Sequence, residues 1–124
     1  MTLSQGDEGL TLVFEGQRVP PTGRAFYSAT VFDAEGETGV QLGVAFEGGK
    51  QSEYFVFDFT EMVQQNLGSE AILSGDTLRA RFDWSAMPAL QDAGPASWSA
   101  AFSLNGKDVG LCPKDQMESL PFPG

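Results

Sequence analysis

Apolar and polar residues alternate with a period of two along most of this chain, and that alternation is typical of half-buried β-strands. The clearest example is the segment 76–84, in which Leu78, Ala80, Phe82 and Trp84 fall on one face. We expect seven or eight strands, at residues 10–15, 24–33, 39–47, 52–57, 71–74, 76–84, 98–104 and 107–112. Short turns separate most neighbouring segments, which favours antiparallel pairing because parallel pairing needs long crossovers.

The length and the strand pattern together predict one all-β domain. A chain of 124 residues has the usual size of a single domain. We expect residues 1–112 to form a mainly antiparallel, two-sheet β-sandwich. A small closed β-barrel is the alternative, because the segment 24–33 is apolar on both faces. Three prolines within residues 113–124 exclude a helix or a central strand there and predict a tail that is either docked or flexible.

One short helix is predicted near residues 58–67. Asp58 has a side chain suited to a helix N-cap, and Glu61, three residues later, completes a capping box. Gly68 would end the helix. A helix of this length is not stable alone, so we expect it to dock on a sheet. Residues 85–95 are expected to form a loop, or a loop with a helical turn after Pro88.

The composition excludes several classes of function. The chain has 17 acidic and 7 basic residues, a formal charge of −10, one cysteine and no histidine. Without histidine there is no Ser-His-Asp or Cys-His catalysis and no imidazole metal ligand, and one cysteine cannot form an intrachain disulfide. The negative charge opposes binding to nucleic acid and to anionic membranes. We therefore expect neither of these two partners.

The sequence carries no sign of a membrane span or of a signal peptide. It contains no run of about 18 apolar residues. Residues 1–9 have neither a basic start nor an apolar core. We therefore expect a cytoplasmic protein, with a mature exported chain whose leader has been removed as the alternative.

Four side chains are candidates for ligand binding. Arg79 and Arg81 form the only local basic pair, and alternate positions on a strand place them side by side. Such a pair can clamp a carboxylate or a phosphate, although a solvated outer face explains it as well. Tyr27 lies in the segment that is apolar on both faces, so it would line a cavity in a barrel. Tyr54 is the second aromatic candidate.

Asp33, Glu35 and Glu37 place three carboxylates in one turn between two strands. Oxygen ligands at alternate positions suit Ca²⁺, which is therefore the only cofactor considered. The turn lacks the twelve-residue spacing of an EF-hand loop, and a solvated turn is the competing interpretation. Paired carboxylates such as Asp58 and Glu61 could serve acid–base catalysis, but their capping role already explains them. We assign no catalytic residue.

These observations favour a non-catalytic binding or assembly module that acts through protein–protein contacts. An acidic surface suits a basic partner, as in an inhibitor or immunity-type protein, and an unpaired sheet edge suits self-association. The alternative is a small barrel around an apolar small molecule, acting as a carrier or as a histidine-free cyclase or isomerase. A third hypothesis is a Ca²⁺- or carbohydrate-binding module.

Overall fold

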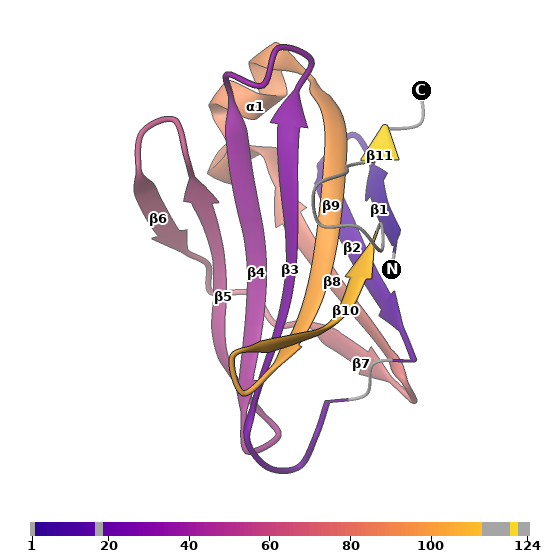
Figure 1. Cartoon of the computed structure of the whole chain (residues 1–124). Helices are drawn as coiled ribbons and strands as arrows, with labels where there is room; N and C mark the ends of the chain where they lie inside the picture. The colour runs from indigo at the N-terminus through magenta and orange to yellow at the C-terminus, as the bar shows by residue number, and fades with distance from the viewer. Residues whose placement is uncertain (1, 17–18, 113–119, 122–124) are drawn as a thin grey trace.

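Strands account for most of the chain (Figure 1). The computed structural model describes residues 2–16, 19–112 and 120–121. Its strands are β1 (Thr2–Gln5), β2 (Gly9–Glu15), β3 (Arg24–Asp33), β4 (Gly39–Glu47), β5 (Lys50–Asp58), β6 (Val63–Asn66), β7 (Ile72–Ser74), β8 (Thr77–Asp83), β9 (Pro95–Leu104), β10 (Lys107–Cys112) and β11 (Leu120–Pro121). The helical elements are the 3₁₀-helix η1 (Trp84–Ala86) and the α-helix α1 (Pro88–Ala93). None of the described helices is long and apolar enough to cross a membrane.

The strands form two antiparallel sheets that pack face to face. The smaller sheet has the order β1-β2-β8-β7, and the larger has the order β10-β9-β3-β4-β5-β6, with β11 also paired to β9. The predicted sandwich is confirmed, and the closed barrel is wrong, because each sheet ends in its own edge strands. The sequence pattern did not predict β1, β6 and β11, which have only four, four and two residues. Such short pieces contain too few residues for an alternation to be recognised.

Part of the predicted C-terminal tail pairs with the larger sheet. Leu120 and Pro121 form β11, whose backbone is in register with Trp98 and Ser97 of β9. The remainder of that tail, residues 113–119 and 122–124, lies outside the described residues.

The predicted helix near residues 58–67 is wrong, because this segment forms a tight turn followed by β6. The Asp58 carboxylate does accept hydrogen bonds from the N–H groups of Thr60 and Glu61, at 2.8 and 3.2 Å. The same bonds serve an Asx turn as well as a helix start. Met62 then adopts a φ of +57°, which reverses the chain so that β6 pairs back with β5. The α-helix lies instead at α1, in the segment expected to be a loop with a helical turn.

The core lies between the sheets and is filled by the inward side chains of both. Tyr27 is fully buried near its centre, with its ring 5.1 Å from Phe14, 5.9 Å from Phe46 and 4.7 Å from Phe102. These close ring contacts fill the space that a barrel cavity would have occupied. The core also buries Leu3, Leu10, Leu12, Val31, Val40, Leu42, Val44, Val56, Leu78, Phe82, Trp84, Met87, Leu90 and Trp98.

The outer face of the larger sheet carries phenyl rings that lie against glycines. Phe26 and Phe55 stack at 5.9 Å with an interplanar angle of 7°. A Cβ atom at Gly43 would overlap the Phe55 ring, so the missing side chain is what lets the ring lie on the sheet. Phe55 is only 6% exposed although it is on the outer face. Within the part of the chain that the structure describes, the ring therefore covers the sheet without a third layer.

Candidate functional site

β7 covers less than half of its neighbour in the smaller sheet. It pairs three residues with Thr77–Arg79, whereas β2 pairs with all of β8 from Thr77 to Asp83. In the described part of the chain, Ala80–Asp83 therefore has a strand neighbour on the β2 side alone. We call the other side of Ala80–Asp83 the open edge. Figure 1 shows how short β7 is beside β8.

The register shows which backbone groups point to the open edge. Gly16 N–H bonds to the Asp76 carbonyl, and Trp84 N–H bonds to the Glu8 carbonyl, each at 3.0 Å. Even-numbered residues of β8 therefore direct their backbone groups to β2, and odd-numbered residues direct theirs away from it. Arg81 and Asp83 consequently present N–H and C=O groups at the open edge.

Tyr54 connects the open edge to the larger sheet. Its hydroxyl donates a hydrogen bond of 2.6 Å to the Arg81 carbonyl, and its ring lies 4.9 Å from Phe82. The Tyr54 side chain is only 4% exposed. Burial raises the pKa of the Tyr54 hydroxyl, and the hydrogen bond to Arg81 acts in the opposite direction but is the weaker effect. The hydroxyl therefore remains a neutral donor at physiological pH.

A surface depression of about 450 Å³ lies beside the open edge. Its lining comes from β2, β5, β7, β8 and the linker between β6 and β7. The lining residues are Thr11, Tyr54, Ser69, Glu70, Ile72, Arg79, Arg81 and Asp83. We call it the edge depression.

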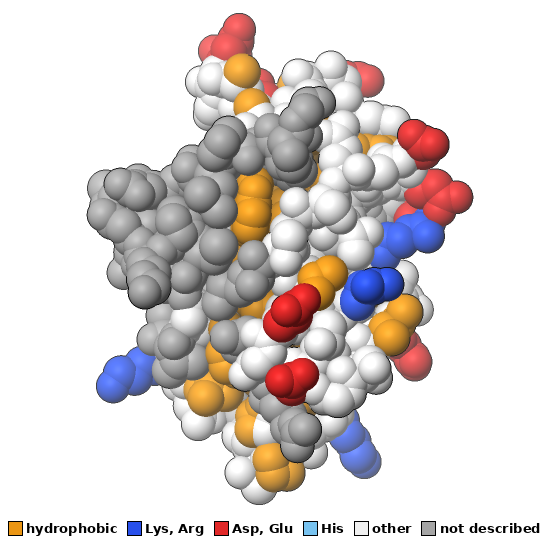
Figure 2. Space-filling view, turned by 90° about the vertical axis from the view of Figure 1, so that its right-hand side faces the viewer, with side chains coloured by type: hydrophobic (Ala, Val, Ile, Leu, Met, Phe, Trp, Pro, Cys, Tyr) orange, Lys and Arg blue, Asp and Glu red, His pale blue; other side chains and the backbone are white. Residues whose placement is uncertain are grey.

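The two arginines of the edge depression differ in their ion pairs. Arg81 forms ion pairs with Glu8 and with Asp83, the latter at 3.3 Å. Arg79 is exposed and has no carboxylate within 4.0 Å among the residues that the structure describes. Arg79 is therefore available to a carboxylate of a ligand. Figure 2 views the sandwich from the edge opposite the open edge. Basic and acidic side chains lie next to one another at the right of this view.

The linker between β6 and β7 is fixed to the larger sheet. Leu67 N–H bonds to the Tyr54 carbonyl at 2.7 Å. The Gln51 side chain donates to the Ser69 carbonyl and accepts from the Ala71 N–H, both at 2.9 Å. These bonds hold the linker against β5, and Ser69 and Glu70 of the linker line the edge depression together with Ile72 of β7.

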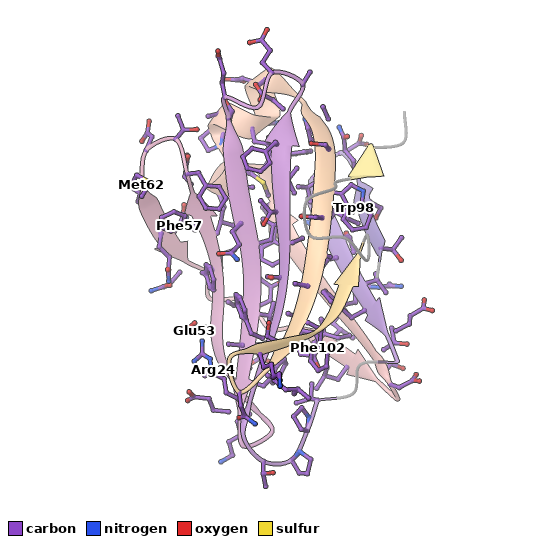
Figure 3. The ribbon with its side chains drawn as sticks, in the orientation of Figure 1. Arg24, Glu53, Phe57, Met62, Trp98 and Phe102 are labelled. Atoms are coloured by element: carbon purple, nitrogen blue, oxygen red, sulfur yellow. The ribbon has the colours of Figure 1, made fainter. Side chains whose placement is uncertain are left out.

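Large apolar side chains are exposed on both of these edge strands. Ile72 and Leu73 of β7 are 63% and 50% exposed. Met62, which precedes β6, and Val63, the first residue of β6, are 71% and 55% exposed. Figure 3 shows Met62 near Phe57 at the outer end of the larger sheet. Exposed apolar groups on edge strands are a common feature of surfaces that pair with another chain.

The structure brings three of the four predicted ligand-binding residues together. Tyr54, Arg79 and Arg81 line the edge depression, although Tyr54 is distant from the arginines in sequence. Tyr27 is not with them, because it lies at 0% exposure in the core. Burial raises the pKa of the Tyr27 hydroxyl to about 12. The other lining residues were not predicted, although the brevity of the 71–74 strand beside the longer 76–84 strand was a signal for an uncovered edge.

The predicted Ca²⁺ turn is held together by its own hydrogen bonds. One carboxylate oxygen of Asp33 accepts from the N–H groups of Glu37 and Thr38, at 2.9 and 3.2 Å. Within residues 2–16, 19–112 and 120–121, no three acidic or cysteine side chains are grouped so that they could hold a metal ion. Asp33, Glu35 and Glu37 therefore share a turn but do not form a ligand cluster.

Two further depressions lie on the surface of the sandwich. One, of about 420 Å³, is lined by Val19, Pro21, Gly49, Leu73 and Gly75, so none of its described lining residues is charged. The other, of about 190 Å³, lies between β6 and α1 and includes two carboxylates. Among the described lining residues, the charged ones therefore belong to the edge depression and to the smaller of these two depressions.

Comparison with known proteins gives no match to a family model, to a curated protein or to a solved structure. The fold defines the class, an all-β two-sheet sandwich with an incompletely covered edge in the smaller sheet. Because one fold supports many functions, the function is argued from the open edge and its surroundings.

Proposed function

We propose that the protein is a non-catalytic binding module that takes up an extended segment of a partner protein as an additional strand at the open edge. The observation that supports this most directly is that β7 pairs with only three of the seven residues of β8. An added strand would continue the line of β7 along Ala80–Asp83. This mode of recognition gains affinity from backbone hydrogen bonds and specificity from alternate side chains.

The backbone at the open edge supplies donors and an acceptor for such a strand. The N–H groups of Arg81 and Asp83 point outward, together with the Asp83 carbonyl, while Tyr54 already occupies the Arg81 carbonyl. Each backbone bond contributes about 0.5–1.5 kcal/mol net. Because few bonds can form, side-chain contacts must add to the affinity.

Side chains around the edge depression suit a strand with alternating character. Apolar residues of the added strand would face the sandwich interior, beside Tyr54. Outward residues would lie along Arg79 and Arg81. Glu70 and Asp83 line the same depression, but Arg79 has no ion-pair partner among the described residues and could bind an acidic side chain of the added strand. Such an exposed ion pair contributes up to about 1 kcal/mol.

The net charge of −10 would act on the rate of association. A partner of net positive charge would be attracted over longer distances, as for an inhibitor or immunity-type protein that covers a basic surface. Its association rate would fall steeply between low and physiological salt. A rate independent of salt contradicts this electrostatic part of the proposal and leaves strand addition as it stands.

The apolar small-molecule carrier has less support than the binding module. It required a barrel cavity lined by Tyr27, whereas the sheets form a sandwich whose centre is filled by Tyr27, Phe14, Phe46 and Phe102. A protein-sized ligand at the surface needs no internal cavity.

Peptides methylated on one edge test strand addition. The probe is the acetylated and amidated heptapeptide Thr-Val-Thr-Val-Thr-Val-Glu, and two isomers carry N-methyl groups on all valine or on all threonine nitrogens. In an extended strand these nitrogens lie on opposite edges, so only one edge can pair with β8. We expect the unmethylated peptide and one isomer to shift the amide signals of Ala80–Asp83 in nuclear magnetic resonance spectra, and the other isomer not to bind. Equal binding of both isomers contradicts strand addition.

A charge-matched pair of variants tests the side-chain contact. Arg79→Gln should weaken binding of the heptapeptide by up to about fivefold. Lys107→Gln removes the same charge at the first residue of β10, outside the edge depression, and should leave binding unchanged. An equal loss in both variants would mean that only net charge matters.

A further inference from the structure

A narrow groove lies between the β5–β6 hairpin and the helical segment of η1 and α1. It has a volume of about 190 Å³ and is lined by Val56, Asp58, Glu61, Val63, Gln65, Ala86, Pro88 and Ala89. We call it the β6–α1 groove. Its volume is below the range of about 300–1,000 Å³ that drug-sized ligands occupy, so it suits a single side chain.

The groove combines apolar walls with two carboxylates. Val56 and Val63 form one wall, and Ala86, Pro88 and Ala89 form the other. Long cationic side chains pack their aliphatic stems against apolar surface while the charged head stays at a polar rim. The apolar walls of the groove suit the aliphatic stem of such a side chain, and the two carboxylates suit its charged head.

Of the two carboxylates of the groove, Asp58 is held in place by the turn, and neither has a cationic partner among the described residues. Asp58 accepts hydrogen bonds from the Thr60 and Glu61 N–H groups, which fix its side chain. Arg24 and Arg81 are the only cations in the ion pairs of the described residues, and their partners are other carboxylates. Neither Asp58 nor Glu61 therefore has a cationic partner among the described residues. None of the described residues that line the groove is a lysine or an arginine.

The groove adjoins the open edge. On β5, Tyr54 lines the edge depression and Val56, the next inward-facing residue, lines the groove. On the other side, Asp83 lines the depression and Ala86 in η1 lines the groove. If a partner strand lies along Ala80–Asp83, the partner residues just beyond its Asp83 end would therefore reach the groove.

We infer that the β6–α1 groove receives a lysine or arginine side chain of the partner, with Asp58 and Glu61 binding the cationic head. This inference rests on the proposed function for the identity of the partner, an extended polypeptide at the open edge. It adds a charge requirement: a basic residue at the Asp58 end of the segment, and an acidic one beside Arg79.

Single amino-acid probes test the groove without strand addition. The probe is N-acetyl-lysine methylamide, and the matched probe is N-acetyl-norleucine methylamide, which has an aliphatic side chain without the ammonium group. We expect the lysine probe to shift the amide signals of residues 58–63 and 86–89, and the norleucine probe to bind at least about fivefold more weakly. Equal binding of the two probes, or shifts confined to other residues, overturns the inference.

Charge-removing variants keep the turn intact and locate the effect. Asp58→Asn retains the side-chain oxygen that accepts the bonds from Thr60 and Glu61, and Glu61→Gln keeps the shape of its side chain. Each should weaken the lysine probe by at least about threefold. Glu35→Gln, on the neighbouring β3–β4 turn and outside the groove, is the control and should have no effect. A loss of the same size in Glu35→Gln would overturn the assignment to this groove.

The two proposals fail in different experiments. If the methylated heptapeptides show no strand addition but the lysine probe binds as expected, the groove is a cation site and the open-edge function is wrong. If the heptapeptide binds at the open edge while the lysine probe does not bind, the proposed function holds and the groove assignment is wrong.

Discussion

The Tyr54 hydroxyl donates a 2.6 Å hydrogen bond to the Arg81 carbonyl and thereby joins the two sheets of the sandwich where the smaller sheet lacks a neighbouring strand. Tyr54 belongs to β5 of the larger sheet, and Arg81 belongs to β8 of the smaller one. The bond satisfies one outward-facing backbone group of the open edge. It leaves the N–H groups of Arg81 and Asp83 to solvent or to a partner.

Tyr54→Phe should lower the free energy of unfolding by about 0.5–1.5 kcal/mol. The variant keeps the ring contact with Phe82 and removes only the bond to Arg81. Urea denaturation at neutral pH measures the difference. An unchanged midpoint would mean that water replaces the hydroxyl at no cost and that the bond does not help to hold the sheets together.

Proline substitutions at adjacent residues of β8 should differ in their effect. The Ala80 N–H points to β2, so Ala80→Pro removes a bond of the central ladder. The Arg81 N–H points to the open edge, so Arg81→Pro removes no bond to β2. We expect Ala80→Pro to be less stable than Arg81→Pro by roughly 2 kcal/mol, as measured by thermal or urea unfolding. The reverse order would contradict the register that defines the open edge.

Alkaline pH should destabilise the fold through its two buried tyrosines. Burial raises the pKa of Tyr27 to about 12 and also raises the pKa of Tyr54, relative to a value near 10 in the unfolded chain. Because the neutral form is favoured in the folded state, the stability contribution is complete below pH 10 and is lost as pH rises toward the folded-state pKa. The loss is about 1.4 kcal/mol per pH unit for one such group.

Urea midpoints measured between pH 9 and pH 12 give this dependence. Tyr27→Phe should show a weaker loss of stability over that range than the unmodified chain. If both proteins lose stability at the same rate, ionisation of Tyr27 is not the cause.

Gly9→Ala should destabilise the smaller sheet by roughly 3 kcal/mol. A Cβ atom at Gly9 would overlap the backbone carbonyl of Phe82, which cannot move without separating β2 from β8. Gly68→Ala is the matched control, because nothing lies within 4 Å of its Cβ position. The control should be neutral or more stable by up to about 1 kcal/mol. Similar unfolding midpoints for the two variants would contradict the close approach of Gly9 to β8.

The period-two pattern predicted the sandwich well because strands such as β8 bury one face and expose the other. Leu78, Ala80 and Phe82 lie inward, and Arg79 and Arg81 lie outward. The helix near residues 58–67 was wrong because Asp58 makes the same bonds in an Asx turn as at a helix start. Whether the chain continues as a helix or turns back depends on pairing between β6 and β5, which is a tertiary interaction and leaves no local signal.

The candidate site was predictable only in part. The spacing of Arg79 and Arg81 indicates a shared face, and Tyr54 is an aromatic candidate in the sequence. Their meeting in one depression depends on how β5 packs against β8, which no short sequence pattern encodes. Tyr27 was linked to a ligand through the barrel alternative, and the sandwich places it in the core instead.

Hydrogen exchange of the Arg81 and Asp83 amides tests the central claim most directly. These amides should exchange quickly in the free protein, because they point to the open edge. Saturation with the unmethylated heptapeptide should slow their exchange at least about tenfold, while the amides of Val63–Asn66 on β6 keep their rates. Unchanged rates for Arg81 and Asp83 at saturation, or protection confined to β6, would contradict strand addition at the open edge.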